Sequence, residues 1–226
     1  FIAADLADMA AMTNLLQGVD GVLHLGGQAM EASWDIIHQA NIVGCHNLFE
    51  AARINGTRRV VFASSNHAIG FYPRHARIGV DHKVRPDSLY GVSKAFGEAV
   101  GSYYADNFGL GVMAIRIGNI DDHPVDERRL SIWISPRDLT QLVRIGLEHP
   151  DLVYEVVWGI SDNARSWWDN EAARRLGYRP QDKAEDHRDH ALAAETGRAP
   201  NSVGDYYQGG DICAEGYSGR PIPEES

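Results

Sequence analysis

The sequence predicts an α/β protein with a Rossmann-like, doubly wound parallel sheet that carries helices on both faces. Short apolar runs alternate along the chain with longer stretches that have the three-to-four-residue apolar spacing of helices. Glycine or polar residues directly follow three of the apolar runs, at positions 26–27, 64–67 and 118–119. Because ligands of such sheets bind beyond the carboxyl ends of the strands, we expect the functional site at this edge.

The first part of the chain is expected to form three strands and two helices. Asp8 is a suitable N-cap for the first helix, and Gly18 ends it. Ser33 is the expected cap of a long helix whose apolar residues repeat every three or four positions until about Gly56. The expected elements are a strand over 1–4, a helix over 8–17, a strand over 21–25, a helix over 33–56 and a buried strand over 59–63.

The second part begins with a loop of about two dozen residues, which is long enough to indicate a functional role. Ser135 is placed to cap a later helix, with Pro136 in its first turn and Asp138 three residues after the cap. The polar tail after about Gly177 is expected to be an extended wrap of low regularity. The other expected elements are a helix over 89–108 and strands over 112–117 and 153–158.

The composition limits the class of protein. With 226 residues, 44% of them hydrophobic, the chain can form one domain with a substantial core. Its 21 basic and 31 acidic residues give a net charge of −10, which disfavours nucleic acid and anionic membranes as partners. No run of 18 apolar residues is present, so we expect no membrane span. Cys45 and Cys213 lack a CxxC or metal-binding spacing, and the histidines form no convincing metal set, which together indicate a cytoplasmic protein without a metal site.

Tyr90 and Lys94 carry the clearest chemistry. They lie four residues apart on the helix expected over 89–108, so both side chains lie on one side of it. A free tyrosine has a pKa of about 10, and a nearby ammonium lowers that value because it favours the phenolate. Such a pair can remove a proton from an alcohol while a hydride leaves the same carbon. The same spacing also occurs by chance on solvated helices, so the surrounding residues matter.

Three neighbouring features support a site, and each has an ordinary structural alternative. Ser64 and Ser65 end a buried strand, where a hydroxyl can bridge a substrate and the phenol or simply bond to the backbone. Gly26 and Gly27 let the backbone approach a cofactor, or form a common tight turn. Asn41 lies inside the helix expected over 33–56, where asparagine is mildly unfavourable. Its side chain either stabilises a bulge or a backbone link near the site, or lies on a polar face of the helix.

The order of these features resembles the extended short-chain dehydrogenase/reductases, the NAD-dependent epimerase/dehydratase family. That order is strand then Gly-Gly, Asn in the next helix, strand then Ser-Ser, and Tyr-x-x-x-Lys. The strings "VLHLGG", "NIVGCHNLFEAAR", "VVFASSNHAIGFYP" and "RPDSLYGVSKAFGE" are similar to the uronate dehydrogenases within this family. The similar segments run from Asp5 to about Pro180. The resemblance implies an NAD-dependent oxidoreductase that acts on a sugar acid.

The resemblance also implies roles for individual residues. Tyr90 would be the base, Lys94 the helper that binds the ribose, and Ser65 the serine partner. Asp5 and Leu6 would contact the adenine of NAD. The residues that would line the dinucleotide are Leu25, Gly26 and Gly27. The residues that would hold the sugar acid are Ser65, Asn66, His67, Asn119 and Arg128.

Arg128 has two interpretations. It lies in the acidic segment 121–130, and on the residues alone a weak surface ion pair with one of the neighbouring carboxylates is favoured. The resemblance instead implies a clamp for a sugar carboxylate or phosphate, because a guanidinium offers paired donors that match such groups.

The chain departs from the family pattern in three places. The usual first strand, its glycine-rich GxGxxG-type loop and the second strand are absent, so we expect that Phe1 is not the natural N-terminus. Residues 1–180 are therefore interpreted as a partial dinucleotide-binding Rossmann domain with substrate loops, and 181–226 as its tail. Ala29 and Asn119 stand where the family has serines, which leaves the exact sugar open.

The leading hypothesis is transfer of a hydride from the anomeric carbon of a uronate to NAD, giving an aldarolactone. A first alternative is an NAD(P)-dependent aldose or sugar-phosphate dehydrogenase. A nucleotide-sugar epimerase or dehydratase is a second, although Asn66 and His67 replace the acidic residue of dehydratases and only 132 residues (226 − 94) follow Lys94. A cofactor-sensing protein without catalysis is a third. The long helices over 33–56 and 89–108 are also suited to pair in a homo-oligomer.

Overall fold

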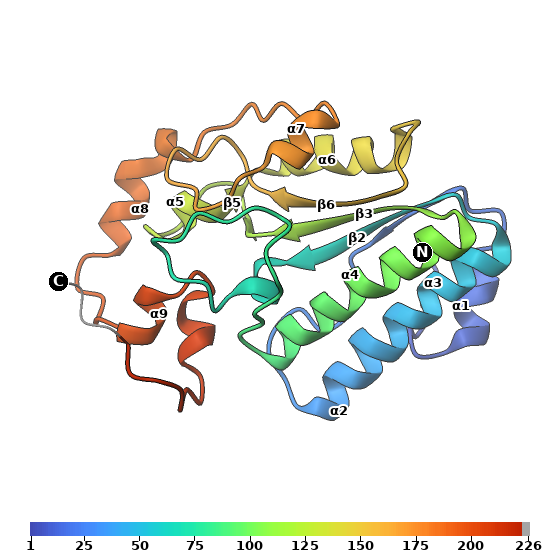
Figure 1. Ribbon diagram of the computed structural model, residues 1–226, viewed down its shortest axis with the longest axis horizontal. Coiled ribbons are helices and arrows are strands. Elements are labelled where there is room, and N and C mark those ends of the chain that lie inside the picture. Colours follow the sequence, from blue (N-terminus) through green and yellow to red (C-terminus); the bar gives the residue numbers. More distant parts are fainter. Residues whose placement is uncertain (223–226) are drawn as a thin grey trace.

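The computed structural model describes residues 1–222 and centres on a four-stranded parallel sheet in the order β1-β2-β3-β6. In Figure 1 the strand arrows point toward the end of the molecule that holds the tail helices α8 (Arg188–Ala194) and α9 (Ser202–Tyr206). The predicted α/β fold with a parallel sheet is confirmed. The strands are β1 (Gly21–His24), β2 (Arg59–Ser65), β3 (Gly111–Ile117) and β6 (Tyr154–Gly159).

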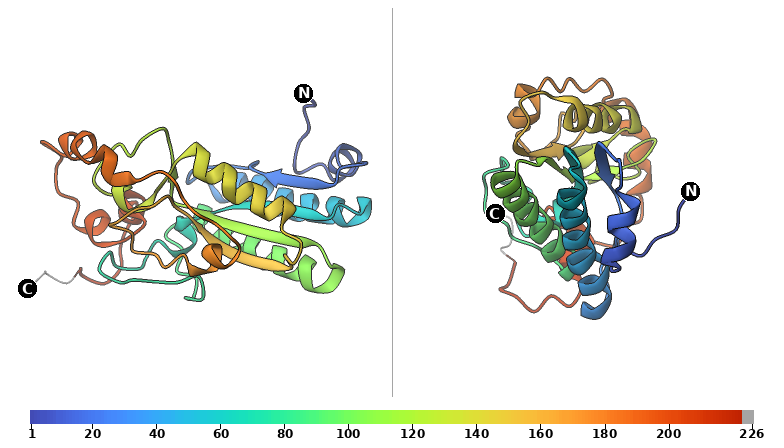
Figure 2. Two further views of the ribbon diagram at one scale, coloured as in Figure 1. Left: turned by 90° about the horizontal axis from the view of Figure 1, so that it is seen from above. Right: turned by 90° about the vertical axis from the view of Figure 1, so that its right-hand side faces the viewer.

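Helices cover both faces of the sheet, as Figures 1 and 2 show. Successive residues of β2 alternate between the two faces, as strand geometry requires. Val60 packs in the core cluster that contains Phe49, and Val61 packs in the cluster that contains Leu142. The first cluster lies under α1 (Met9–Leu15), α3 (Gly44–Asn55) and α4 (Leu89–Phe108), and the second under α6 (Pro136–Glu148) and α7 (Glu171–Arg175).

The helix predicted over 33–56 is a single helical run with an irregular middle. It consists of α2 (Trp34–Ile37), the π-helical segment η1 (His38–Val43) and α3. Short π segments are rare and often occur at functional sites. Gly56 ends the run with a φ of 67°, as predicted. Ser33 occupies the predicted N-cap position, but its side chain makes no capping hydrogen bond.

The other two predicted caps are confirmed. The carboxylate of Asp8 accepts hydrogen bonds from the backbone N–H groups of Ala10 and Ala11 at the start of α1. The hydroxyl of Ser135 accepts one from the N–H of Asp138 at the start of α6. Each cap satisfies donors that the first helical turn leaves unpaired.

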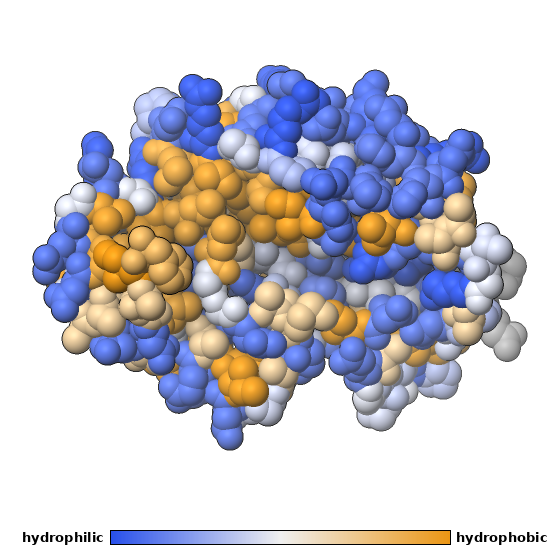
Figure 3. Space-filling view, turned by 180° about the vertical axis from the view of Figure 1, so that it is seen from behind, coloured by the Kyte–Doolittle hydropathy of each residue, from blue (hydrophilic) through white to orange (hydrophobic). Residues whose placement is uncertain are grey.

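The strand predicted over 1–4 is wrong, because these residues are irregular and exposed. A strand needs a neighbour to pair its backbone groups, and within residues 1–222 no strand pairs with this segment. β1 is an edge strand with Leu23 exposed, and Figure 3 shows broad apolar areas on the face opposite to that of Figure 1. None of the described helices is both long and apolar enough to cross a membrane.

The tail is more regular than predicted. Besides α8 and α9 it contains the 3₁₀ turns η3 (Ala184–His187) and η4 (Gly210–Ala214). It packs over the carboxyl edge of the sheet, where Tyr207 forms a backbone bridge with Pro73. Gln208 is fully buried there. Further short elements at this end are η2 (Asn66–Ile69), β4 (Asn119–Ile120), α5 (Arg129–Ile132) and β5 (Trp133–Ile134).

Candidate active site

A cavity of about 640 Å³ opens at the carboxyl edge of the sheet, beyond the ends of β1, β2 and β3. Its walls also include the first turn of α4 and parts of the tail, so segments far apart in the sequence meet in it. The predicted site residues that line it are Leu25, Gly26, Gly27, Ser65, Asn66, His67, Tyr90, Lys94, Asn119 and Arg128.

Tyr90 and Lys94 lie on one face of α4, with the Lys94 Nζ atom 5.4 Å from the centre of the Tyr90 ring. Lys94 donates a hydrogen bond of 2.7 Å to the carbonyl of Ala63 at the end of β2. Burial lowers the pKa of Lys94 to about 8, because desolvation disfavours the charged ammonium. Burial also raises the pKa of Tyr90; a hydrogen bond with Ser65 opposes this effect, and the negative charge of Asp87 adds to it.

The structure distinguishes the two serines at the end of β2. Adjacent strand residues point to opposite faces. The Ser64 hydroxyl lies 2.5 Å from a carboxylate oxygen of Glu98, which also forms a buried ion pair of 2.8 Å with Arg116. The Ser65 hydroxyl instead accepts a hydrogen bond from the N–H of His67 beside the cavity. Ser65 is therefore the serine positioned next to Tyr90, and Ser64 belongs to a polar network beneath the site.

Asn41 forms the link near the site that its unusual position suggested. Its Oδ1 accepts a 2.7 Å hydrogen bond from the N–H of Gln28, and its Nδ2 donates to the Gln28 carbonyl and to the Ser93 hydroxyl. The buried amide thus ties the loop after β1 to the helix that carries the tyrosine and lysine. The alternative, a place on a polar helix face, is wrong.

The loop after β1 has two glycines that its surroundings require. Gly27 has a φ of 124°, which side chains rarely tolerate, and a Cβ there would lie 2.6 Å from the Asn41 Oδ1. A Cβ at Gly26 would lie 2.9 Å from the Leu6 side chain. Close packing against Asn41 and Leu6 therefore requires glycine at both positions, and both glycines also line the cavity, as does Lys94.

Asp5 and Leu6 do not line this cavity. The Asp5 carboxylate accepts a hydrogen bond from the N–H of Ala7, and Asn47 donates to the carbonyls of Leu6 and Ala7. Leu6 packs behind Gly26. The adenine contact expected for Asp5 and Leu6 stays a prediction.

Arg128 is held by the tail. Its Nε and Nη2 both donate to the carbonyl of Gln208, at 3.0 and 2.8 Å. Among residues 1–222 no carboxylate forms an ion pair with it, whereas the next residue, Arg129, pairs with Asp126. Burial and the positive charges of Arg129 and Arg74 lower the pKa of Arg128 to about 10. The predicted alternative of a surface ion pair for Arg128 is therefore wrong.

Two amides lie beside this guanidinium. In the orientation that satisfies its partners, the Asn66 amide donates to the carbonyls of Ile117 and Gly118 and accepts from the Nη2 of Arg128 at 3.2 Å. The Oδ1 of Asn119 is buried at the cavity wall without a hydrogen-bond partner in the described structure. Such an acceptor is costly to leave unpaired and is suited to a ligand hydroxyl.

Sequence reasoning missed two acidic residues that shape the site, Glu31 and Asp87. The Glu31 carboxylate accepts hydrogen bonds from the N–H groups of Leu89 and Tyr90 at the start of α4. The buried Asp87 carboxylate lies 2.7 Å from the Nδ1 of His67. Neither contact has a local sequence signal. Glu31 is 58 and 59 residues from the two groups that it binds, and Asp87 is 20 residues from His67.

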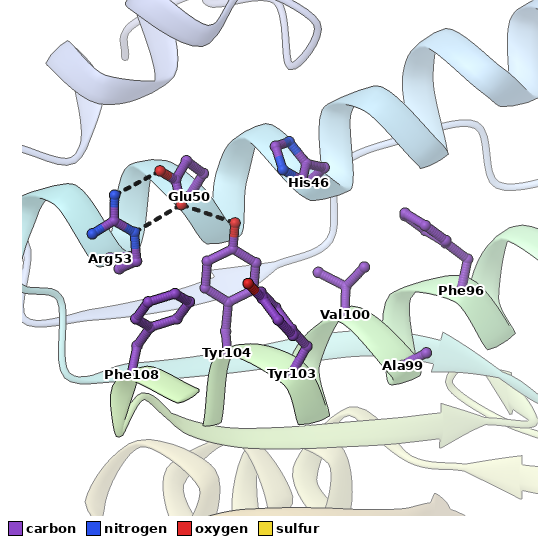
Figure 4. A pocket seen from close by; sticks show the side chains of 9 residues that line it. All are labelled: His46, Glu50, Arg53, Phe96, Ala99, Val100, Tyr103, Tyr104 and Phe108. Atoms are coloured by element: carbon purple, nitrogen blue, oxygen red, sulfur yellow. Dashed lines mark hydrogen bonds and ion pairs between the residues drawn. The ribbon is translucent and has the colours of Figure 1, made fainter. Parts of the chain in front are cut away.

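A second cavity, of about 650 Å³, lies between α3 and α4 and contains none of the predicted site residues. Figure 4 shows Tyr104 and Arg53 directed toward Glu50, with which both form hydrogen bonds. Tyr103 and Phe108 form its aromatic wall. Within the described residues no group of three potential ligands is placed to hold a metal ion, here or elsewhere. The carboxyl-edge cavity is therefore the candidate active site.

Comparisons with known proteins show the family and the fold of the chain. The model of the NAD dependent epimerase/dehydratase family matches residues 1–121. The uronate dehydrogenase of Agrobacterium fabrum is 44% identical over 209 residues, which cover 92% of this chain and 79% of that protein. The NAD-dependent glucose-6-phosphate dehydrogenase of Haloferax volcanii is 41% identical over 80% of this chain and 75% of its own length. A crystal structure of a variant uronate dehydrogenase from Agrobacterium tumefaciens, complexed with NAD, superposes with a TM-score of 0.91 at 42% identity, covering 99% of this chain and 83% of that one.

Proposed function

Since the chain belongs to the NAD dependent epimerase/dehydratase family, we propose that it oxidises a uronate at its anomeric carbon with NAD and releases an aldarolactone. The observation that carries the proposal is the environment of Arg128. This guanidinium lines the cavity, is fixed by the Gln208 carbonyl and has no carboxylate partner among the described residues. A charged group in that state favours a negatively charged ligand, and a carboxylate matches its paired donors.

The proposed chemistry assigns one task to each residue around Tyr90. NAD supplies the hydride acceptor when it is bound. Tyr90 accepts the proton of the anomeric hydroxyl while that carbon loses its hydride and the carbon–oxygen double bond of the lactone forms. Lys94 places its charge beside the phenol and donates to the ribose, and Ser65, whose hydrogen bond lowers the pKa of Tyr90, holds the reacting oxygen.

The substrate is proposed to lie with its acid group toward Arg128. Asn66 would help to fix that arginine, and the unpaired Asn119 oxygen would accept a hydrogen bond from a sugar hydroxyl. Binding energy from these remote groups orients the reacting carbon and thereby supports catalysis.

A sugar phosphate is the second candidate substrate. A guanidinium binds phosphate as well as carboxylate, and Arg74 and Arg198 also line the cavity. The similarity to a glucose-6-phosphate dehydrogenase favours the same possibility. Epimerase or dehydratase chemistry has less support, because Asn66 and His67 follow the serine at the end of β2. The assembled Ser65, Tyr90 and Lys94 support catalysis over cofactor sensing alone.

The test is a dehydrogenase assay with galacturonate, glucuronate, the matching neutral aldoses and glucose 6-phosphate, each with NAD and NADP. We expect the highest kcat/KM for a uronate with NAD. Higher activity on glucose 6-phosphate would show that a sugar phosphate, and not a uronate, is the preferred substrate. A preference for neutral aldoses would contradict both acid-binding assignments.

A further inference from the structure

The carboxylate of Asp87 has an unusual place beside the candidate active site. Asp87 lies two residues before α4, and its side chain is completely buried. Its Oδ2 is 2.7 Å from the Nδ1 of His67, and its Oδ1 accepts a 2.8 Å hydrogen bond from Ser88. The thiol of Cys213, from the tail, approaches Oδ2 at 3.7 Å. An aspartate enclosed in this way requires a function or a strong structural partner.

The surrounding backbone leaves no room for another group. A Cβ placed at Gly70 or at Gly209 would overlap the Asp87 carboxylate. The N–H of Asp87 also donates to the His67 carbonyl, so the two residues are joined through backbone and side chain. Three separate segments therefore close on one carboxylate: the turn after β2, the start of α4, and the tail.

The contact bears on which nitrogen of the His67 ring carries a proton. An ionised carboxylate accepts hydrogen bonds and cannot donate them, so a hydrogen bond from His67 to an ionised Asp87 requires the proton on Nδ1. In the neutral ring the other nitrogen, Nε2, is then a hydrogen-bond acceptor. His67 lines the cavity, with its ring edge-on to Tyr90 at a centroid distance of 5.8 Å.

We propose that Asp87 is a positioning residue that holds His67 with the proton on Nδ1, so that Nε2 accepts a hydrogen bond from a sugar hydroxyl. The inference rests on the proposed function and deepens it, because it divides recognition between two residues. Arg128 binds the acid group of the sugar, and His67 forms a hydrogen bond with one of its neutral hydroxyls. The tail contributes to both, through Gln208 at Arg128 and through Gly209 and Cys213 at Asp87.

The first test reads the His67 ring directly by ¹⁵N NMR of the full chain, with His67→Gln to assign the signal. We expect the proton on Nδ1 in the unaltered protein. In Asp87→Asn the amide can donate to Nδ1, so the Nε2-protonated form should appear. The matched control is Asp138→Asn, which alters another fully buried carboxylate that contacts Ser161 away from the cavity. The control should leave the His67 signals unchanged.

The second test measures oxidation. Carboxylates that orient metal-binding histidines contribute about 10- to 100-fold, and the same geometric role is proposed here for Asp87. We expect Asp87→Asn to lower kcat/KM for the uronate by about that factor, with NAD affinity unchanged. The same substitution made in His67→Gln should have little further effect, since Asp87 acts through His67.

The two tests separate two failures. The NMR result does not depend on turnover, so it can be read even if no uronate is oxidised and the proposed function fails. A proton on Nε2 in the unaltered protein would overturn the inference even if uronates are good substrates. Equal losses from Asp87→Asn with and without His67 would also overturn it, because the carboxylate would then act through the fold alone.

Discussion

The Lys94 ammonium lies 5.4 Å from the centre of the Tyr90 ring and is anchored to the Ala63 carbonyl at the end of β2. The hydrogen bond to Ala63 thus fixes the position of the Lys94 ammonium beside the Tyr90 ring. Because the two side chains are one helical turn apart, the helix itself sets their spacing. The pair can be tested by removing the hydroxyl, by changing the pH, and by changing the cation.

Tyr90→Phe keeps the aromatic ring and removes the group that accepts the proton. General base catalysis is typically worth about 10²–10⁴-fold in rate, and we expect kcat to fall by that factor. NAD affinity, measured by calorimetry, should change little. Tyr103→Phe is the matched control, because Tyr103 is an exposed tyrosine on the same helix. Near-normal turnover by the Tyr90 variant would remove it from the mechanism.

The pH dependence follows from the same pair. The reactive form has one proton less than the phenol–ammonium form. Burial lowers the pKa of Lys94 to about 8 and raises that of Tyr90, so the first proton leaves the pair near pH 8. We therefore expect kcat/KM to rise with pH, with a midpoint near pH 8, and to level about one pH unit above that midpoint. In Lys94→Arg the cation does not titrate in this range, so the rise should move to higher pH. A profile that falls between pH 6 and 8 would contradict this assignment.

Arg128→Ala should act on the acid group of the substrate. Truncating one partner of a buried, charged hydrogen bond costs about 2–5 kcal/mol. This corresponds to a loss of roughly 30- to several-thousand-fold in kcat/KM for galacturonate, since about 1.4 kcal/mol is tenfold. The matching neutral aldose should be little affected. Arg129→Ala is the control, because Arg129 already pairs with Asp126. Equal losses on acid and neutral substrates would show that Arg128 does not bind the carboxylate.

The buried ion pair beneath the site should matter for stability. Glu98 and Arg116 both have side chains less than 10% exposed, and Glu98 also binds Ser64. Glu98→Ala leaves a buried guanidinium unpaired, so we expect the free energy of unfolding to fall by about 3–5 kcal/mol in urea titrations. Glu148→Ala, which breaks an exposed pair with Arg144, should change the free energy of unfolding far less. Similar losses in both variants would mean that burial of the first pair is unimportant.

Much of the secondary structure could be predicted from local patterns in the sequence. α4 has the predicted bounds, because a capping Ser88, a helical apolar spacing and Gly109 all act within a few residues. The strands at 21–25, 59–63, 112–117 and 153–158 are confirmed with shifts of one or two residues at their ends. The position of Ser65 beside Tyr90 follows from strand alternation and from the common edge of a parallel sheet.

The predictions that were wrong or missing concern segments whose structure depends on residues far away in the sequence. Residues 1–4 have the apolar composition of a strand, but a strand also needs a paired neighbour. The tail is polar and has weak periodicity, so its short helices depend on contacts with loops far away in the sequence, such as that of Arg74 with the Gly204 carbonyl. Glu31 and Asp87 were missed for the same reason, since the groups that they bind belong to other segments.

The dependence of Arg128 on Gln208 has a consequence for biosynthesis. Gln208 follows Arg128 by 80 residues, and Gly204 follows Arg74 by 130, so these groups leave the ribosome well after the strands of the sheet. A nascent chain can therefore bury its apolar core before its acid-binding group has a fixed position. The same separation makes the finished enzyme vulnerable to one cut. A cut between α8 and α9 would separate Gln208 from Arg128 along the chain, and we expect it to weaken the proposed uronate oxidation more than the fold of the sheet.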